Sequence, residues 1–215
     1  MIKICIRFIY IIIEVMLMTT DKYSAKLTGN PFLFFEMRVI AALKDQGLSN
    51  NQIKEQVFIK NLLQYKTQKS ITKRFNEVLS RLEVLNSDLI NLLANADANT
   101  AKLICLYAII KTDRLFYEFM EEVVYEKHQY RQNHLEQSDI KRFFDIKTEQ
   151  SDEISKWTDE TIKKLYNVFK NLLRDAGLIN DSKHLELQGQ FISSELCDSL
   201  NNIGDSKYLK LMLGE

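Results

Sequence analysis

Residues 96–127 read ADANTAKLICLYAIIKTDRLFYEFMEEVVYEK, and this stretch decides the fold. Its first half, which ends near Ile110, is apolar on nearly every side, a pattern typical of a helix buried in the middle of a protein. Thr112 and Asp113 can compete for backbone hydrogen bonds, so a kink or a new helix start is expected near them. The stretch therefore predicts one or two long helices, of which the first is central.

The composition extends the helical prediction to the whole chain of 215 residues. Six glycines and a single proline are few for this length, which favours long uninterrupted helices over a turn-rich sandwich or barrel. A hydrophobic content of 46% is ample for a core. We therefore expect an all-α protein, a multi-helix bundle with at most a small β-hairpin.

The overall charge does not point to a partner, because 29 basic residues balance 29 acidic ones. No global field attracts nucleic acid or an anionic membrane, so any basic patch must be local. Cys5, Cys105 and Cys197 lie far apart and lack the spacing of disulfide frameworks or zinc sites. These features fit a reducing cytosol, and we expect a cytoplasmic protein.

Residues 1–18, MIKICIRFIYIIIEVMLM, are the one segment that suggests a membrane. Lys3, Arg7 and Glu14 interrupt the segment, whereas a spanning helix needs about 20 mostly apolar residues. The small residues that end a secretory signal are missing as well. We therefore expect that Met18 is the natural start, that the segment before it is an artefact of gene calling, and that no membrane is involved.

The first expected part of the protein, residues 19–133, is a helical bundle. Asn30 and Pro31 open a helix that Gly47 closes, and Ser49 then caps a second, short helix. Two helices joined by a glycine turn occur in DNA-binding helix-turn-helix proteins, and also in many bundles without that role. Both interpretations stay open for this pair. A third helix with one apolar stripe and a basic opposite face is expected over about 69–85.

The second expected part, residues 134–215, is helical and packs on the first. Ser138 and Ser151 are expected to cap short helices. Thr158 precedes a strongly amphipathic helix over 162–175. This part is more charged than the first and carries several helix starts in succession.

A small hairpin is expected after the 162–175 helix. Residues 178–180 fit one strand and 184–187 the other, around Asp181 and Ser182. Short helix, long helix and hairpin is the order of a winged helix-turn-helix, in which 162–175 would be the recognition helix. A helical bundle trimmed by a loop explains the same pattern.

The sequence shows no catalytic pattern and no metal-binding pattern. Its glycines are scattered, which excludes the glycine-rich phosphate loops of P-loop and Rossmann proteins. His128 and His134 lie six residues apart, too far for a helical metal pair, and His184 is isolated. We expect neither an enzyme nor a bound metal or other cofactor.

One acidic set shares helical spacing and could mimic a di-iron carboxylate face, but the Glu-x-x-His partners of such a site are missing. A solvated acidic face is the favoured interpretation, and a surface that docks another protein is the alternative. The set consists of Glu118, Glu121, Glu122 and Glu126.

The strongest local charge bias lies over residues 60–81, where six basic residues stand against Glu77 alone. Lysines at three- and four-residue spacing would project from one side of a helix and meet successive phosphates. A second basic cluster lies over 156–174, and a solvated basic face is the competing interpretation. The candidate nucleic-acid-binding residues are Lys66, Lys69, Lys73, Arg74, Arg81, Lys163, Lys164 and Lys170.

Several stretches carry a resemblance to one known family, and they are YSAKLTG (23–29), FFEMRVIAALKDQGLS (34–49), TKRFNEVLSRL (72–82), LYAIIKTDRLFYEF (106–119) and WTDETIKKLYNVFKNLLRDAGLI (157–179). Together they resemble the BrxA family of bacterial BREX (bacteriophage exclusion) defence systems, whose members were once labelled inner-membrane proteins of unknown function. The family typically starts near the YSAKL region, which agrees with the start-site interpretation of the leader.

The resemblance implies an all-helical fold related to the NusB antitermination factor, and double-stranded DNA binding in a phage-restriction complex. It implies no active site. The leading hypothesis is therefore a non-enzymatic, DNA-binding component of BREX defence. RNA binding in the manner of NusB-like factors is one alternative. The other is an adapter that docks further BREX proteins through the acidic set.

Overall fold

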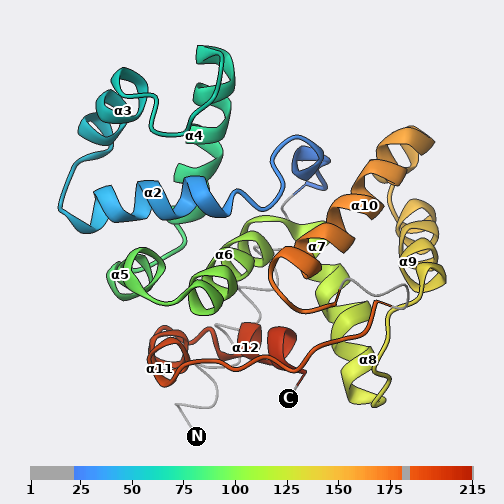
Figure 1. Cartoon of the computed structure of the whole chain (residues 1–215). Coiled ribbons are helices and arrows are strands. Elements are labelled where there is room, and N and C mark those ends of the chain that lie inside the picture. The colour runs from blue at the N-terminus through green and yellow to red at the C-terminus, as the bar shows by residue number, and fades with distance from the viewer. Residues whose placement is uncertain (1–21, 181–184, 215) are drawn as a thin grey trace, which may run out of the picture.

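A computed structural model describes residues 22–180 and 185–214 (Figure 1). The leader and the expected hairpin turn at Asp181 and Ser182 lie outside these residues. In chain order the elements are η1 (Lys26–Thr28), α2 (Phe34–Asp45), α3 (Asn50–Ile59), α4 (Gln68–Leu82), α5 (Ser87–Asn95), α6 (Ala98–Thr112), α7 (Arg114–Phe119), η2 (Met120–Tyr125), α8 (Glu126–Gln129), α9 (Gln137–Gln150), η3 (Ile154–Lys156), α10 (Asp159–Asp175), α11 (Ser194–Asn202) and α12 (Ser206–Leu213). The expected all-α fold is confirmed.

Helix α6 is the centre of the molecule, as its sequence predicted. Every residue from Leu103 to Ile110 is buried, so the helix has no solvent face along this length. Helices α2, α4, α5, α7 and α12 all pack against it. Because elements from both ends of the chain share this helix, the hydrophobic core is continuous from the first part of the sequence to the last.

The predicted break after α6 is confirmed at Asp113. Its backbone is extended, with φ −133° and ψ 106°, and its side chain accepts a hydrogen bond from the backbone N–H of Phe116 at 3.0 Å. This bond caps α7 and so starts a new helix in a new direction. The chain then runs through η2, a π-helical segment that the hydrophobic pattern did not predict, into α8.

Helices α2 to α5 form a lobe on the left side of Figure 1, with α3 and α4 at its top and α5 at its bottom. Helix α2 packs against α4 and α5, and α3 contacts both α2 and α4. Gly47 has a φ of +81° after α2, and Ser49 caps α3 in a capping box with Gln52. The predicted C-terminal end of α2 and the predicted N-terminal start of α3 are therefore confirmed.

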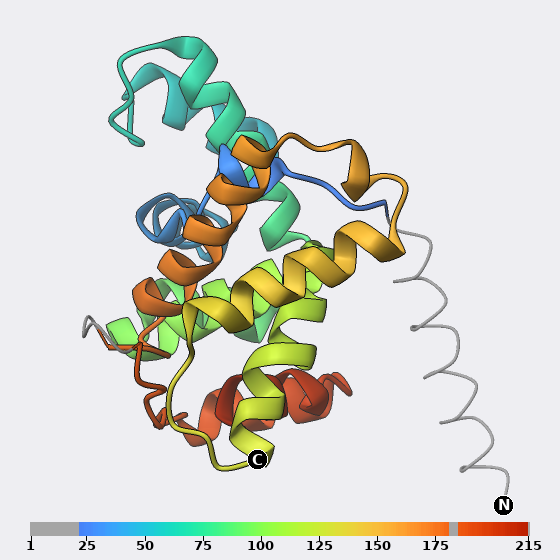
Figure 2. The same ribbon diagram turned by 90° about the vertical axis from the view of Figure 1, so that its right-hand side faces the viewer.

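Helices α9 and α10 form a pair beside α7 and η2 (Figure 2). The ring of Phe169 in α10 lies 5.0 Å from Phe116 and 5.1 Å from Phe119, measured between ring centroids. Thr158 caps α10, as predicted. The prediction for Ser138 is wrong, because α9 already begins at Gln137, where the side chain of the preceding Glu136 accepts the capping bond.

The expected hairpin is reduced to two isolated antiparallel bridges, one between Ile179 and Leu187 and one between His134 and Glu186. The second bridge brings in the connection between α8 and α9, which the local pattern could not indicate. Helix α12 then packs against η2 and α6. No helix within the described residues is long and apolar enough to cross a membrane.

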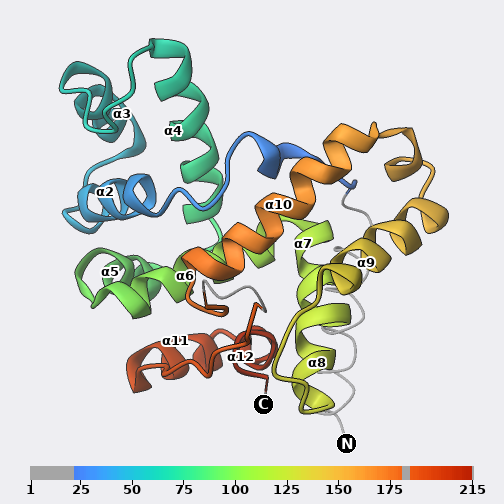
Figure 3. The same ribbon diagram turned by 45° about the vertical axis from the view of Figure 1, so that its right-hand side comes forward.

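Residues 22–33, which we call the strap, lie between α4 and α10 (Figure 3). Polar groups of other elements hold the strap at several points. The ammonium of Lys26 donates to the carbonyl of Thr112 at 2.8 Å, and Arg74 of α4 donates to the carbonyl of Gly29 and to the side-chain oxygen of Asn30. The strap therefore joins the lobe to the rest of the protein.

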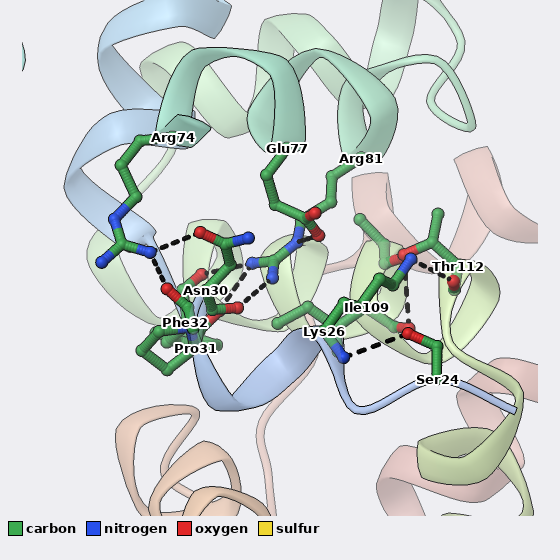
Figure 4. A network of polar contacts seen from close by, with 12 residues as sticks. Ser24, Lys26, Asn30, Pro31, Phe32, Arg74, Glu77, Arg81, Ile109 and Thr112 are labelled. Carbon is green, nitrogen blue, oxygen red and sulfur yellow. Dashed lines mark hydrogen bonds and ion pairs between the residues drawn. The ribbon is translucent and has the colours of Figure 1, made fainter. Parts of the chain in front are cut away.

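Arg81 fixes the end of the strap (Figure 4). Its side chain is 0% exposed and donates to the carbonyls of Asn30 at 2.6 Å, Pro31 at 2.7 Å and Phe32 at 3.0 Å. Its Nε pairs with Glu77 at 3.1 Å. Burial lowers the pKa of Arg81 while Glu77 opposes that change, and a guanidinium stays charged under such conditions.

These contacts correct two predictions from the sequence. Arg81 was a candidate phosphate contact, but it is buried and its donors are taken by the protein itself, so its role is structural. Helix α2 was expected to open at Asn30 and Pro31, but it begins at Phe34. The preceding carbonyls point to the guanidinium, and Leu33 adopts a left-handed conformation with φ 52°.

Replacing Arg81 with alanine is expected to lower the free energy of unfolding by roughly 3 kcal/mol or more, because three strap carbonyls and Glu77 would lose their donor. Urea denaturation followed by circular dichroism measures the change. Lys69→Ala, at an exposed position of the same helix, is the control and should change stability by less than about 0.5 kcal/mol. Equal effects of the two substitutions would contradict the structural role of Arg81.

Asp113 is a second buried charge, and its ionisation is unfavourable. The residue is 4% exposed, its Oδ2 has no hydrogen-bond partner, and burial raises its pKa to about 6. A raised carboxyl pKa means that the folded protein holds the proton more tightly than the unfolded chain. The contribution of protonated Asp113 to the free energy of unfolding is therefore complete below the ordinary carboxyl pKa of 3.8. It is lost as the pH rises through the raised pKa of about 6.

Asp113→Asn is therefore expected to stabilise the protein above pH 6, by up to about 3 kcal/mol, and to have much less effect near pH 4. Asp97→Asn is the matched control, because hydrogen bonds from Thr100 lower the pKa of this exposed cap and the sign reverses. That variant should lose stability at pH 8 relative to the wild type. Urea denaturation at pH 4.5 and pH 8 tests both, and a pH-independent effect of Asp113→Asn would contradict the assignment.

Candidate nucleic-acid interface

Helix α4 presents two of the predicted lysines to solvent. Lys69 and Lys73 are both exposed, four residues apart on the same side of the helix. Thr67 caps the helix by accepting the backbone N–H of Ser70 at 3.2 Å, and the first turn contains no acidic residue. The positive end of the helix dipole is therefore not neutralised by the helix itself. The opposite face is buried and consists of Ile71, Phe75, Val78 and Leu82.

Lys66 is exposed but does not lie on α4, which begins two residues later at Gln68. The prediction of one helical row of three lysines is therefore wrong for its first member. Lys66 belongs to the connection between α3 and α4. Lys73, in turn, folds its ammonium against Gly29 of the strap, so its charge lies beside the strap.

Arg74 is largely engaged by the protein, like Arg81. Its guanidinium donates to the carbonyl of Gly29 and the side chain of Asn30, and it lies 5.7 Å from the centre of the Tyr65 ring. Figure 4 shows both arginines pointing from α4 to the strap. Arg74 therefore holds the strap in this structure, which corrects the expectation that it projects toward a phosphate.

Two further lysines lie on α3 and directly after it. Sequence reasoning left Lys54 out, and it counted Lys60 in the basic stretch over 60–81 without naming it as a contact. Lys54 and Lys60 are exposed, and the buried Ile53 and Val57 supply the period that could have placed them on the solvent side. Over residues 50–82, the exposed lysines stand against a single exposed acid, Glu55. We call them the lobe lysines, and they are Lys54, Lys60, Lys66, Lys69 and Lys73.

The second predicted cluster lies on α10 and is more balanced. Lys164 pairs with Glu160 at 2.8 Å, and Asp159 adds another negative charge in the same turn. Lys163 is exposed at the rim of a groove between α9 and α10, whereas Lys170 is half-buried. The lobe lysines and the basic residues of α10 therefore form two separate clusters, and the strap lies between α4 and α10.

The acidic set is partly used inside the protein. Glu118 accepts the hydroxyl of Tyr23 at 2.9 Å and pairs with Arg114 at 2.8 Å and Lys147 at 2.7 Å. Burial acts to raise the pKa of Glu118, but the bonds from Lys147 and Arg114 outweigh burial and lower it. Lys147 is 5% exposed and also pairs with Glu122 at 2.6 Å. The remaining members, Glu121 and Glu126, are exposed.

The described residues provide exposed charged groups, above all the lobe lysines. They contain no cluster of three His, Cys, Asp or Glu side chains that could hold a metal ion. Burial raises the pKa of the Cys105 thiol to about 12, so this cysteine is not a nucleophile at neutral pH. What the lobe lysines can do chemically is bind an anion, and their spread over two helices suits an extended one.

Comparisons with known proteins place the chain in a family. The model of the BrxA family matches residues 21–204. The BREX protein BrxA of Bacillus cereus (strain H3081.97) is 32% identical over 194 residues, which is 90% of this chain and 97% of the relative. The BREX protein BrxA of Paramagnetospirillum magneticum is 24% identical, over 85% of this chain and 92% of the relative.

A solved structure supports the fold alone. An uncharacterized protein from Magnetospirillum magneticum superposes with a TM-score of 0.76 at 22% identity, over 91% of this chain and all of that one.

The BREX protein BrxA of Escherichia coli O9:H4 (strain HS) adds a match at 20% identity, over 93% of this chain and 94% of the relative. The matches to the family model and to full-length relatives agree, and the chain belongs to the BrxA family of BREX defence proteins.

Proposed function

We propose that this protein is a non-enzymatic component of BREX defence that binds double-stranded DNA through the lobe lysines. One observation carries the proposal. The chain as a whole has no net charge, yet five exposed lysines stand against one exposed acid on α3, α4 and their connection. Such an uncompensated cluster on a neutral protein indicates a local polyanion site, because general electrostatic attraction is absent. A DNA ligand also implies a cytoplasmic location.

The proposed contact is to the phosphates rather than to the bases. A lysine ammonium binds a phosphate as a point charge, whereas an arginine reads a guanine through two parallel hydrogen bonds. Both arginines of α4 are engaged with the strap. We therefore expect affinity that depends strongly on salt and little discrimination through direct base contacts.

Helix α10 supplies a secondary contact in this proposal. Lys163 is exposed and lacks an ion pair with the acids of the first turn, and Lys170 lies two turns further along the helix. Lys164 contributes less, because its charge is already paired with Glu160. The adapter alternative is weaker, because two of the four acidic residues, Glu118 and Glu122, already form ion pairs with Lys147. RNA binding would use the same lobe lysines, so it must be separated by experiment.

Replacing Lys66, Lys69 and Lys73 together with alanine is expected to flatten the plot of log K against log salt by up to about 2.7, because each lost phosphate contact removes about 0.9. Fluorescence anisotropy with a short duplex at several salt concentrations gives the slope. The matched control replaces Lys22, Lys141 and Lys210, which are also exposed but lie outside the lobe. An unchanged slope in the lobe variant, or an equal reduction of the slope in the control, would contradict DNA binding by the lobe lysines.

Competition separates DNA from RNA. The wild-type protein bound to a labelled DNA duplex is challenged with unlabelled duplex DNA and with single-stranded RNA of the same length and sequence. If duplex DNA is the ligand, the duplex displaces the probe at a concentration at least several-fold lower than the RNA does. Stronger displacement by RNA would replace the DNA proposal with the RNA alternative.

A further inference from the structure

Ile59, the last residue of α3, is an apolar residue that the fold leaves exposed to solvent. Its side chain is 74% exposed, whereas Ile53 and Val57 of the same helix are fully buried. The adjacent Phe58 packs edge-on against Phe75 of α4, with ring centroids 6.0 Å apart. Helix α3 is thus anchored to α4 on one side and presents a branched apolar side chain to water on the other.

The connection after Ile59 has a defined shape. Asn61 and Gln64 adopt left-handed conformations, with φ of 45° and 57°. The N–H of Gln64 donates to the carbonyl of Asn61 at 2.9 Å, and the side chain of Asn61 donates to the carbonyl of Tyr65 at 3.0 Å. Leu63, which lies between Asn61 and Gln64 in the sequence, is buried. Non-glycine residues held in this region concentrate at binding sites, where surrounding contacts enforce them.

Residues 59–66, which we call the tip, also carry an uncompensated charge. Lys60 follows Ile59 directly and Lys66 ends the segment, and neither forms an ion pair among the described residues. An exposed apolar side chain on a segment that also carries two exposed lysines does not resemble the core of a protein interface, where lysine is depleted and apolar residues gather. It does resemble the arrangement with which proteins insert an apolar residue into DNA.

We propose that Ile59 is an apolar wedge that inserts between two base pairs of duplex DNA from the minor groove, while Lys60 and Lys66 hold the flanking phosphates. The inference rests on the proposed DNA binding and adds a mode of contact to it. Insertion unstacks one base step and kinks the duplex toward the major groove. Pyrimidine–purine steps such as TA unstack most easily, so the wedge would favour them without any hydrogen bond to a base.

The experiment compares Ile59→Ala and Ile59→Leu in the full chain, with a duplex of about 30 base pairs that carries a donor and an acceptor dye at its ends and a central TA step. Wild type and Ile59→Leu should bend the duplex and raise energy transfer. Ile59→Ala should lose the bending and bind roughly tenfold more weakly at every salt concentration, with an unchanged salt slope. Phe191→Ala, at an 84% exposed residue outside the lobe, is the control and should behave as wild type.

The outcomes separate the wedge from the proposed function. If Ile59→Ala binds and bends the duplex like wild type while the triple lysine variant still flattens the salt slope, the wedge is wrong and DNA binding stands. If no variant affects binding, or no duplex binds, both proposals fail. If Ile59→Ala instead loses capture of another BREX protein with duplex binding intact, the tip is a protein-docking site and the wedge is overturned.

Discussion

The architecture depends on how one buried guanidinium is satisfied. A buried charge costs several kcal/mol unless it is paired and hydrogen-bonded. Arg81 meets this demand with three consecutive strap carbonyls, and those carbonyls are free to point at it only because residues 30–32 are not helical. The start of α2, the position of the strap and the orientation of α4 are therefore set together. The lobe is fixed to the body at the same point.

Helix α4 divides its cations between the fold and the surface. Arg74 and Arg81 lie seven residues apart and so face the same side, toward the strap, whereas Lys69 and Lys73 are exposed. The chemistry suits the division, because a planar guanidinium with several donors can satisfy several carbonyls, and a flexible ammonium keeps its hydration until it meets an anion. The charge excess over residues 60–81 therefore overstated the number of groups available to a ligand.

The sequence was sufficient where local physics decides the structure. The apolar circumference of α6, the break at Asp113 and the caps at Ser49 and Thr158 all follow from side chains within a few residues. It was insufficient where a partner lies far along the chain. No residue near Arg81 in the sequence indicates that its partners are carbonyls about 50 residues away. The bridge from His134 to Glu186 has no local sequence signature either. Of the candidate site, the sequence named Lys66, Lys69 and Lys73 but not Lys54, and the neighbours of these lysines in space could not be predicted.

Rigidity connects the fold to the proposed contact with DNA. Unstacking a base step costs a few kcal/mol, and a wedge on a loosely ordered loop would add the cost of ordering that loop on binding. Here Phe58 packs on Phe75, and the side chain of Asn61 bonds to the carbonyl of Tyr65, so the backbone on both sides of Ile59 is already ordered. Helix α4 carries that order back to the strap through Arg81. In the proposed complex Arg81 would touch no phosphate, and its contribution would be to hold α4, which carries Lys69 and Lys73, against the strap.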